Sequence, residues 1–346
     1  MAQSLALKYR PQVFADLTEQ SSIVRILTNQ IETGTIKHGY LFCGGAGTGK
    51  TTSARIFANM INHGSGTPIE LDAASNNSVE DIRRLCEDAQ TQSIDSEYKV
   101  FILDEVHSLS NQAWQAMLKT LEEPPAKSIF IFCTTDPQKI PNTILSRVQR
   151  YNFQRISQDG IMNRLFYILE QESEIEKCDW EATAVEYIAK IADGGMRDAI
   201  TLMDKCLSYD RNLTVTNVIK ALGIADYETM ANLTDAVIYN KAEDVIELIS
   251  SVHASGMDLK QFIKNYFEFV LDLNIYRVTG DLSLTKLPNT ITVDGKDIKL
   301  DEVGCVRAES DLISKLLDFT LKLLSSIKWE QNPKPVIIAN FMIFME

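Results

Sequence analysis

The chain has 346 residues, of which 45% are apolar and 23% charged, as in globular proteins with room for two or three domains. The net charge of −13 comes mainly from residues 156–346, which hold 19 Lys and Arg against 31 Asp and Glu, while residues 1–155 are nearly balanced. This acidity excludes nucleic-acid binding through a long-range positive field, but it allows a local basic surface in the N-terminal part.

Membrane, secretion and disulfide signals are missing from the sequence. No apolar run approaches the roughly 18 residues of a membrane span, and no signal peptide opens the chain, so we expect an intracellular protein. The six cysteines are scattered without a Cys-x-x-Cys pair, which predicts neither a disulfide framework nor a zinc site.

The first 155 residues alternate predicted strands and helices. This alternation predicts an α/β fold with a parallel sheet that helices cover on both faces. Before it, Pro11 and the polar residues after it suggest a loop. The expected strands cover residues 40–43, 69–72, 99–105, 129–133 and 150–153, and the expected helices cover residues 21–31, 52–60, 78–90 and 113–121.

Residues 44–51 read Gly-Gly-Ala-Gly-Thr-Gly-Lys-Thr, the P-loop pattern G-x-x-x-x-G-K-S/T between a predicted strand and a predicted helix. The glycines let successive N–H groups point at a phosphate chain, and the helix N-terminus adds positive potential. Lys50 is expected to reach the β- and γ-phosphates and Thr51 to bind Mg²⁺. The full motif in this context favours phosphate binding over a plain glycine turn. The predicted nucleotide-binding residues of this loop are Gly44, Gly45, Ala46, Gly47, Thr48, Gly49, Lys50, Thr51 and Thr52.

Polar residues end the next two buried strands. Asp104 is the expected Mg²⁺ ligand and Glu105 the expected general base for the attacking water, although a strand also often ends in a solvated acid. Thr135 is a candidate donor to the γ-phosphate or the lytic water, or else part of a local turn. His107 is expected to line the site and not to bind a metal, because no other histidine is close in sequence.

Two arginines are candidates for stabilising transition-state charge. Arg147, in Leu145-Ser146-Arg147, is a candidate arginine finger for a neighbouring subunit, with a surface salt bridge as the alternative. Arg197, after Gly194-Gly195, is placed to reach a nucleotide from the helical part, with an ion pair to Asp198 as the alternative.

From residue 161 onward the patterns are almost all helical. Residues 223–227 are interpreted as a joint, and residues 291–298 as a hairpin around Asp294-Gly295. The expected helices here cover residues 161–170, 182–192, 196–207, 215–222, 242–251, 259–273, 312–327 and 335–344.

Together these motifs resemble the ATPase subunits of sliding-clamp loaders in the AAA+ superfamily, and most of all the gamma/tau subunits of bacterial replicative polymerases. The resemblance covers residues 5 to about 205 densely and is weak beyond residue 225. The stretches that carry it include Lys8-Tyr9-Arg10-Pro11, the P-loop, Asp104-Glu105-Val106-His107, Leu145-Ser146-Arg147 and Gly194-Gly195-Met196-Arg197-Asp198-Ala199.

The resemblance implies three domains: a RecA-like AAA+ ATPase domain over residues 1–155, a helical lid over 156–224 and a helical collar over 225–346. It implies ATP and Mg²⁺ as cofactors and a homo- or hetero-pentameric ring. Such a ring opens a sliding clamp and places it on primer–template DNA, with hydrolysis triggering release, in the cytoplasm of a bacterial cell or a phage-infected host. Arg147 would be the finger acting in trans, Thr135 the first sensor and Arg197 the second. The residues expected on the adenine side are Tyr9, Arg10 and Pro11.

The sequence departs from this family in three places. Only residues 63–66 stand where bacterial relatives carry a four-cysteine module, so we expect no zinc. Val148 replaces the cysteine that usually follows the finger arginine. Asn76-Asn77-Ser78 replaces basic residues that face DNA phosphates, so we expect a shallower salt dependence of DNA binding. The candidate DNA contacts are Ser75, Asn76, Asn77, Ser78, Arg83 and Lys119.

The chain also ends soon after the expected collar, without a proline-rich tail. Together with the missing zinc module, this favours a phage or otherwise divergent replication system as the source.

Two other functions remain open. A hexameric DNA-translocating motor of the branch-migration type would share the P-loop and the acids at 104 and 105, but the Glu122–Pro125 segment and the acidic C-terminal part favour a loader. A ring subunit without ATPase activity is disfavoured by the intact Lys50-Thr51 and Asp104-Glu105 pairs.

Overall fold

The computed structural model describes residues 3–222, 227–285, 287, 290–293, 296–299 and 310–346. By its internal contacts the chain divides into two compact units, Met1–Leu213 and Thr214–Glu346. The boundaries expected for three domains stay a prediction. In the described part of the chain, no helix combines the length and the apolar character needed to cross a bilayer.

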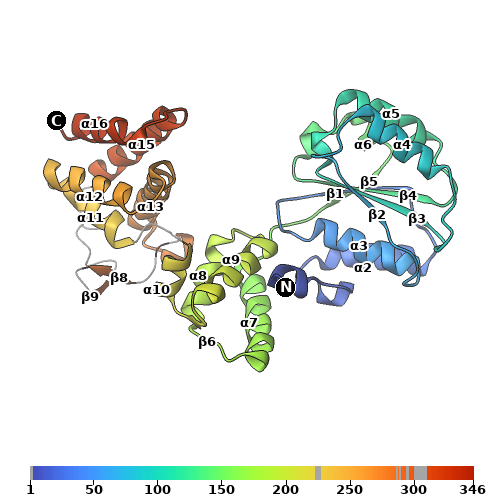
Figure 1. Ribbon diagram of the computed structural model, residues 1–346, viewed down its shortest axis with the longest axis horizontal. Helices are drawn as coiled ribbons and strands as arrows, with labels where there is room; N and C mark the ends of the chain where they lie inside the picture. The colour runs from blue at the N-terminus through green and yellow to red at the C-terminus, as the bar shows by residue number, and fades with distance from the viewer. Residues whose placement is uncertain (1–2, 223–226, 286, 288–289, 294–295, 300–309) are drawn as a thin grey trace. The chain divides into compact units, whose positions relative to one another are not determined.

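The first unit contains a five-stranded parallel sheet with the strand order β2-β3-β4-β1-β5. Its strands are β1 (Gly39–Cys43), β2 (Ile69–Asp72), β3 (Lys99–Asp104), β4 (Ser128–Thr134) and β5 (Gln149–Asn152). One face is covered by α2 (Ser21–Glu32) and α3 (Lys50–Ile61), and the other by α4 (Val79–Ala89), α5 (Asn111–Glu122) and α6 (Asn142–Leu145) (Figure 1). The predicted two-sided parallel sheet is therefore confirmed.

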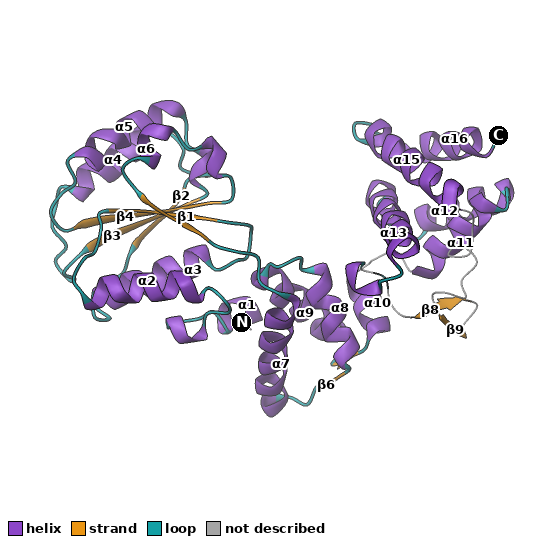
Figure 2. Cartoon of the chain, turned by 180° about the vertical axis from the view of Figure 1, so that it is seen from behind, coloured by secondary structure: helices purple, strands orange, loops and turns teal. Residues whose placement is uncertain are grey.

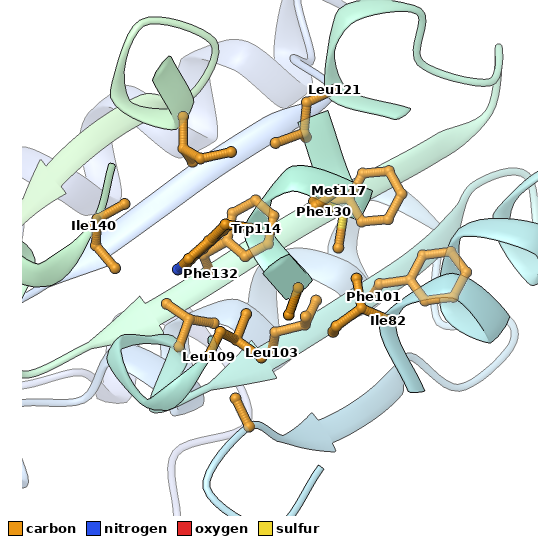
Figure 3. Packing of buried hydrophobic residues seen from close by; sticks show 14 of the residues in the cluster. Ile82, Phe101, Leu103, Leu109, Trp114, Met117, Leu121, Phe130, Phe132 and Ile140 are labelled. Carbon is orange, nitrogen blue, oxygen red and sulfur yellow. The ribbon is translucent and has the colours of Figure 1, made fainter. Parts of the chain in front are cut away.

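Alternate residues of each central strand belong to the hydrophobic cores on opposite faces of the sheet. Phe101 of β3 and Phe132 of β4 pack with Trp114 of α5 in one core cluster (Figure 3). Their neighbours Ile102 and Ile131 belong to the cluster on the side of α2 and α3. Each fully buried large apolar side chain stabilises the fold by roughly 1.5–3 kcal/mol. Burial on both faces explains why these strands read as unbroken apolar runs in the sequence.

The strand register brings the chemically important loops to one edge of the sheet. Cys43 pairs with Thr134, and Asp72 with Asp104. The pairing of β3 with β4 links these two pairs, so β1, β2, β3 and β4 end within about one residue of each other. Ligands of open parallel sheets bind outside this carboxyl edge. The P-loop after β1 therefore lies beside the acids that end β3.

The remaining part of the first unit is helical. It contains α7 (Gln158–Ile175), α8 (Ala182–Ile191) and α9 (Met196–Tyr209), and two short parallel strands, β6 (Asp179–Trp180) and β7 (Asn212–Leu213). At the N-terminus, α1 (Leu5–Lys8) packs on α9, in a stretch for which the sequence predicted no regular element. A single helical turn has no periodic pattern, and α1 depends on the burial of Leu5.

The second unit is mainly helical (Figure 2). Its helices are α10 (Val215–Leu222), α11 (Tyr227–Ile238), α12 (Ala242–Ala254), α13 (Leu259–Thr279), α15 (Ser310–Ile327) and α16 (Pro333–Met345). The predicted hairpin is confirmed by antiparallel pairing of β8 (Thr290–Val293) with β9 (Lys296–Lys299), while its turn residues 294–295 lie outside the described residues.

The sequence interpretation missed α11. Residue 227, which was assigned to a joint, begins this helix, and residues 223–226 lie outside the described part. The buried face of α11 includes Ala231 and Thr234, which dilute its apolar pattern. The Thr234 hydroxyl is satisfied by the carbonyl of Met230 at 2.8 Å and by the Tyr266 hydroxyl at 3.1 Å.

Candidate nucleotide-binding site

The P-loop joins β1 to α3 and also touches the first turn of α9. Gly47 and Gly49 have φ angles of +69° and +97°, a left-handed conformation that glycine adopts without steric cost. A Cβ atom at Gly47 would lie 3.0 Å from the Cα of Gly195. The Met196 N–H donates to the Gly47 carbonyl at 3.0 Å. Because Gly47 has no side chain, the backbone of the P-loop can contact the backbone at the start of α9 directly.

Lys50 lies against the P-loop with only 7% of its surface exposed. Its Nζ donates hydrogen bonds to the carbonyls of Gly44 at 2.9 Å and Gly45 at 2.7 Å. Burial lowers the pKa of Lys50, while Cys133, Glu105 and Asp104 act in the opposite direction. An ammonium group held in this way at the loop fits the β- and γ-phosphates of a nucleotide.

Thr51 and Asp104 form the second part of the site. The Thr51 hydroxyl donates to Asp104 Oδ2 at 2.7 Å, and Asp104 Oδ1 accepts the Glu105 N–H at 3.0 Å. Hydroxyl and carboxylate oxygens are ligands that Mg²⁺ prefers. Among the described residues no group of three or more His, Cys, Asp or Glu is arranged to hold a metal. A magnesium ion at Thr51 and Asp104 would therefore take its other ligands from phosphate and water, as Mg²⁺ commonly does.

Glu105 is fixed by residues at the ends of two neighbouring strands. Its Oε2 accepts a hydrogen bond from Thr135 Oγ1 at 3.2 Å and lies 3.2 Å from His107 Nδ1, which is also 3.3 Å from Thr134 Oγ1. Glu105 has a φ of +48°, and such sparsely populated conformations, which cost roughly 1–3 kcal/mol, cluster at functional sites. The sequence analysis expected both Thr135 and His107 at the site, but it predicted the contact of neither with Glu105.

Residues 10–17 lie beside the end of the P-loop and the start of α3. Arg10 Nε donates to Thr52 Oγ1 at 3.2 Å, and Leu17 lies 3.4 Å from the Cβ position of Gly49. Burial lowers the pKa of Arg10, and the positive charges of Arg55 and Arg197 lower it further. The backbone nitrogen of Arg197 lies 3.3 Å from the Cβ position of Gly47, so the first turn of α9 is beside the P-loop, while the reach of the Arg197 side chain to a nucleotide stays a prediction. Tyr9 and Pro11 flank Arg10 in the chain.

The candidate finger Arg147 lies near the surface of the first unit. It donates to Glu122 Oε1 at 2.7 Å and also bonds the carbonyl of Thr143. Its side chain is 32% exposed. Within its own chain, Arg147 therefore forms a surface ion pair, which is the alternative given above. Its action on a second subunit stays a prediction.

The candidate DNA contacts fall into two groups. Ser75 and Asn76 bond Asp72, and the Ser78 hydroxyl accepts the Asp81 N–H at 3.2 Å as the predicted cap of α4. These polar groups form hydrogen bonds within their own loop and helix start, and Asn77 between them is exposed. Two basic side chains, Arg83 of α4 and Lys119 of α5, are exposed on helices that pack together.

Two cavities adjoin this site in the first unit. One, of about 510 Å³, lies between the P-loop and the residues that join α8 to α9, and includes Gly45, Ala46 and Gly195. The other, of about 480 Å³, lies between residues 15–19 and α7. Both are formed where the sheet domain meets the helices that follow it.

One residue close to this arrangement was missed from the sequence altogether. Glu172 of α7 is buried and accepts hydrogen bonds from Lys8 and Tyr9, more than 160 positions earlier in the chain. No motif surrounds it, so only the fold identifies it.

Three consecutive segments match protein families. Residues 68–157 match "DNA polymerase III, delta subunit", and residues 160–211 match "DNA polymerase III clamp loader subunit, ATPase lid domain". Residues 213–299 match "DNA polymerase III subunits gamma and tau domain III".

Curated relatives agree with these matches. The DNA polymerase III subunit tau of Bacillus subtilis is 33% identical over 354 residues, covering 96% of this chain and 61% of the relative. The subunit tau of Escherichia coli is 36% identical and is covered over 43% of its length. The subunit gamma of Buchnera aphidicola from Acyrthosiphon pisum is 33% identical, with 79% of this chain and 80% of the relative covered. The chain thus spans about half the length of the tau relatives.

Among solved structures, the chain resembles the RuvB Holliday junction branch migration motor of Thermotoga maritima. The TM-score is 0.51 at 15% identity, with 85% of this chain and 96% of the motor covered. A variant of the same RuvB matches 72% of this chain with the same TM-score. At this identity the likeness concerns the fold of a P-loop ATPase alone.

Proposed function

This chain belongs to the family of DNA polymerase III gamma/tau clamp-loader subunits, and on that premise we propose that it is an ATP-hydrolysing subunit of a sliding-clamp loader. The observation that carries the ATPase part is the meeting of Thr51, Asp104, Glu105 and Lys50 at one edge of the sheet. This set provides a phosphate-binding cation, oxygen ligands for Mg²⁺ and a carboxylate for the attacking water.

Each residue has a distinct role in the proposed reaction. Lys50 and the P-loop N–H groups bind the β- and γ-phosphates, while Thr51 and Asp104 hold Mg²⁺, which neutralises phosphate charge when bound. Glu105 accepts a proton from the attacking water or orients it. Thr135 and Arg197 contact the γ-phosphate from the sheet and from α9, and Arg147 supplies charge to the site of the next subunit.

The loader part of the proposal rests on the family. We propose that the chain works in a homo- or hetero-pentameric ring that opens a sliding clamp, places it on primer–template DNA and releases it after hydrolysis. The exposed Arg83 and Lys119 on α4 and α5 support a contact with the DNA backbone, because phosphate contacts depend on such cations. ATP and Mg²⁺ are the proposed cofactors, and the lack of zinc stays a prediction.

A DNA-translocating motor is the second candidate, because the fold resembles a branch migration motor. The matches of residues 160–211 and 213–299 to clamp-loader lid and gamma/tau families favour the loader over the motor. The relatives named above are bacterial, and a phage source stays a prediction.

The deciding experiment is steady-state ATP hydrolysis by the purified chain, with and without primer–template DNA and the clamp of the same source. Synergistic stimulation by the clamp and primed DNA would support a loader. Stimulation by any duplex without regard to the clamp would favour the motor. The Lys50→Ala variant is the control for a contaminating ATPase, and its activity should be at background under every condition.

A further inference from the structure

Glu172 is a buried carboxylate of α7 that the reaction described above does not use. It is 9% exposed, and its Oε1 accepts hydrogen bonds from Lys8 Nζ and from the Tyr9 hydroxyl, each at 2.7 Å. Burial acts to raise the pKa of Glu172, but the hydrogen bonds of Lys8 and Tyr9 outweigh it and lower the pKa below its ordinary value. A buried charge of this kind is retained only where its partners are well placed.

The partners of Glu172 belong to a short N-terminal arm, residues 5–10, which lies along the helices α7 and α9. The Leu5 N–H donates to Asp204 Oδ2 of α9 at 3.0 Å. Arg164 of α7 donates to the carbonyl of Tyr9 at 2.9 Å, and the Tyr9 ring meets the Tyr167 ring edge to face at 6.5 Å. The arm is thus fixed to α7 at the backbone, the ring and the hydroxyl of a single residue, Tyr9.

The other end of the arm reaches the P-loop helix. Arg10, the next residue after Tyr9, is half-buried and donates to Thr52 Oγ1 at 3.2 Å. Thr52 directly follows Lys50 and Thr51, the two residues proposed to bind phosphate and Mg²⁺. A continuous path of hydrogen bonds and one peptide link therefore runs from Glu172 through Tyr9 and Arg10 to α3.

We propose that Glu172 is a positioning residue of the nucleotide site, which acts through Tyr9 to hold Arg10 against the P-loop helix. With the hydroxyl of Tyr9 fixed, the Arg10 guanidinium is already ordered when the nucleotide binds, so less conformational entropy is lost on binding. Glu172 itself touches neither the P-loop nor Asp104, so its loss affects nucleotide affinity without changing the groups that carry out hydrolysis. This inference rests on the proposed ATP binding.

The test is the dissociation constant of Mg²⁺–ATP for the full-length chain, measured by calorimetric titration together with the thermal unfolding midpoint of each variant. Glu172→Ala is expected to weaken ATP binding about five- to tenfold, which corresponds to the net contribution of one ordinary hydrogen bond. Tyr9→Phe is expected to weaken ATP binding by a similar factor. The double variant of Glu172→Ala and Tyr9→Phe should weaken it no further, because the effects of two residues that act through one contact are not additive. Glu174→Ala, an exposed acid on the same helix, is the matched control and should bind like the wild type.

The conservative variant separates positioning from a general loss of stability. Glu172→Gln keeps an oxygen that accepts the Tyr9 hydroxyl, so its ATP affinity should stay within about twofold of the wild type. An equal loss for the glutamine and alanine variants, or additive losses for Glu172→Ala and Tyr9→Phe, would overturn the proposal. Should the alanine variant not fold, wild-type affinity in Tyr9→Phe would overturn it as well. A wild-type chain that binds no ATP would instead refute the proposed function.

Discussion

Thr51 and Asp104 are 53 residues apart in the chain, and their side chains form a hydrogen bond of 2.7 Å between Thr51 Oγ1 and Asp104 Oδ2. The contact follows from the order and register of the sheet. β1 and β3 both pair with β4 in parallel, so the loop after β1 and the end of β3 meet at the same edge. A hydroxyl and a carboxylate held at this distance are already placed for a shared magnesium ion, whose binding then requires little rearrangement.

The first prediction concerns this pair. Thr51→Ala and Asp104→Asn should each raise the Mg²⁺ concentration needed for half-maximal ATP hydrolysis by about tenfold or more, since the first removes the hydroxyl ligand and the second the negative charge of the carboxylate ligand. The two effects should not be additive, because both residues serve one ion. Thr51→Ser keeps the hydroxyl and serves as the control. A Mg²⁺ requirement unchanged in Asp104→Asn would contradict this assignment.

Glu105→Gln should separate nucleotide binding from hydrolysis. The amide keeps the shape of the side chain but accepts a proton poorly, so single-turnover hydrolysis should fall by about 10²- to 10⁴-fold while ATP affinity is preserved. Glu123→Gln, an exposed neighbour of the Arg147 partner Glu122, is a suitable control. Hydrolysis by Glu105→Gln at the wild-type rate would show that another group activates the water.

Arg147→Ala should leave ATP binding intact and lower hydrolysis in the assembled ring by about a thousandfold, within the range known for arginine fingers. Breaking the partly exposed pair with Glu122 should cost the fold at most about 1 kcal/mol. The decisive measurement mixes Arg147→Ala chains with Lys50→Ala chains. If the finger acts in trans, interfaces that pair an intact Lys50 with an intact Arg147 recover activity. Failure to recover any activity in the mixture would favour a structural role.

Arg83→Ala and Lys119→Ala should each weaken binding of primer–template DNA uniformly across sequences. The slope of log affinity against log salt should decrease in magnitude by about 1 for each variant, because each removes one phosphate contact. Lys127→Ala is the control, since Lys127 precedes β4 at the opposite edge of the sheet from the P-loop. Equal slopes for all three variants and the wild type would place the DNA elsewhere on the surface.

Asp235 of α11 offers a test of stability in the second unit. Its Oδ1 is buried without a hydrogen-bond partner among the described residues, and burial raises its pKa above the ordinary value of 3.8, against the opposing charge of Lys241. A carboxyl group whose pKa is raised on folding destabilises the folded state at pH values above its folded pKa, where it must be charged. Asp235→Asn should therefore stabilise the chain at pH 7, by about 1 kcal/mol.

The gain from Asp235→Asn should shrink as the pH falls through the raised pKa toward 3.8, because the wild-type carboxyl then becomes neutral in the folded state. Urea unfolding at pH 7 and at successively lower pH measures this difference. A gain that does not depend on pH would mean that side-chain packing, and not charge, is responsible.

Local sequence patterns were sufficient for much of this molecule. The P-loop, the acids at 104 and 105 and the apolar strands are each encoded within a few consecutive residues, and the structure has them as expected, including Ser78 as the cap of α4. The parallel sheet followed from the alternation of strands and helices, because βαβ connections leave few other arrangements. Elements without a clear periodic pattern of apolar residues, such as α1 and α11, were not predicted.

The tertiary structure alone decided which distant residues meet. It brought Thr135 to Glu105 across the ends of β3 and β4, Gly195 to Gly47, and Glu172 to Lys8 and Tyr9. Side chains such as Glu172 carry no local signal, because their partners are set by how the helices pack and not by spacing along the chain. The sequence by itself therefore determined which catalytic and binding side chains this protein has. The packing of α7 and α9 against the N-terminal arm decided which other residues contact and position them, because those contacts join residues far apart in the chain.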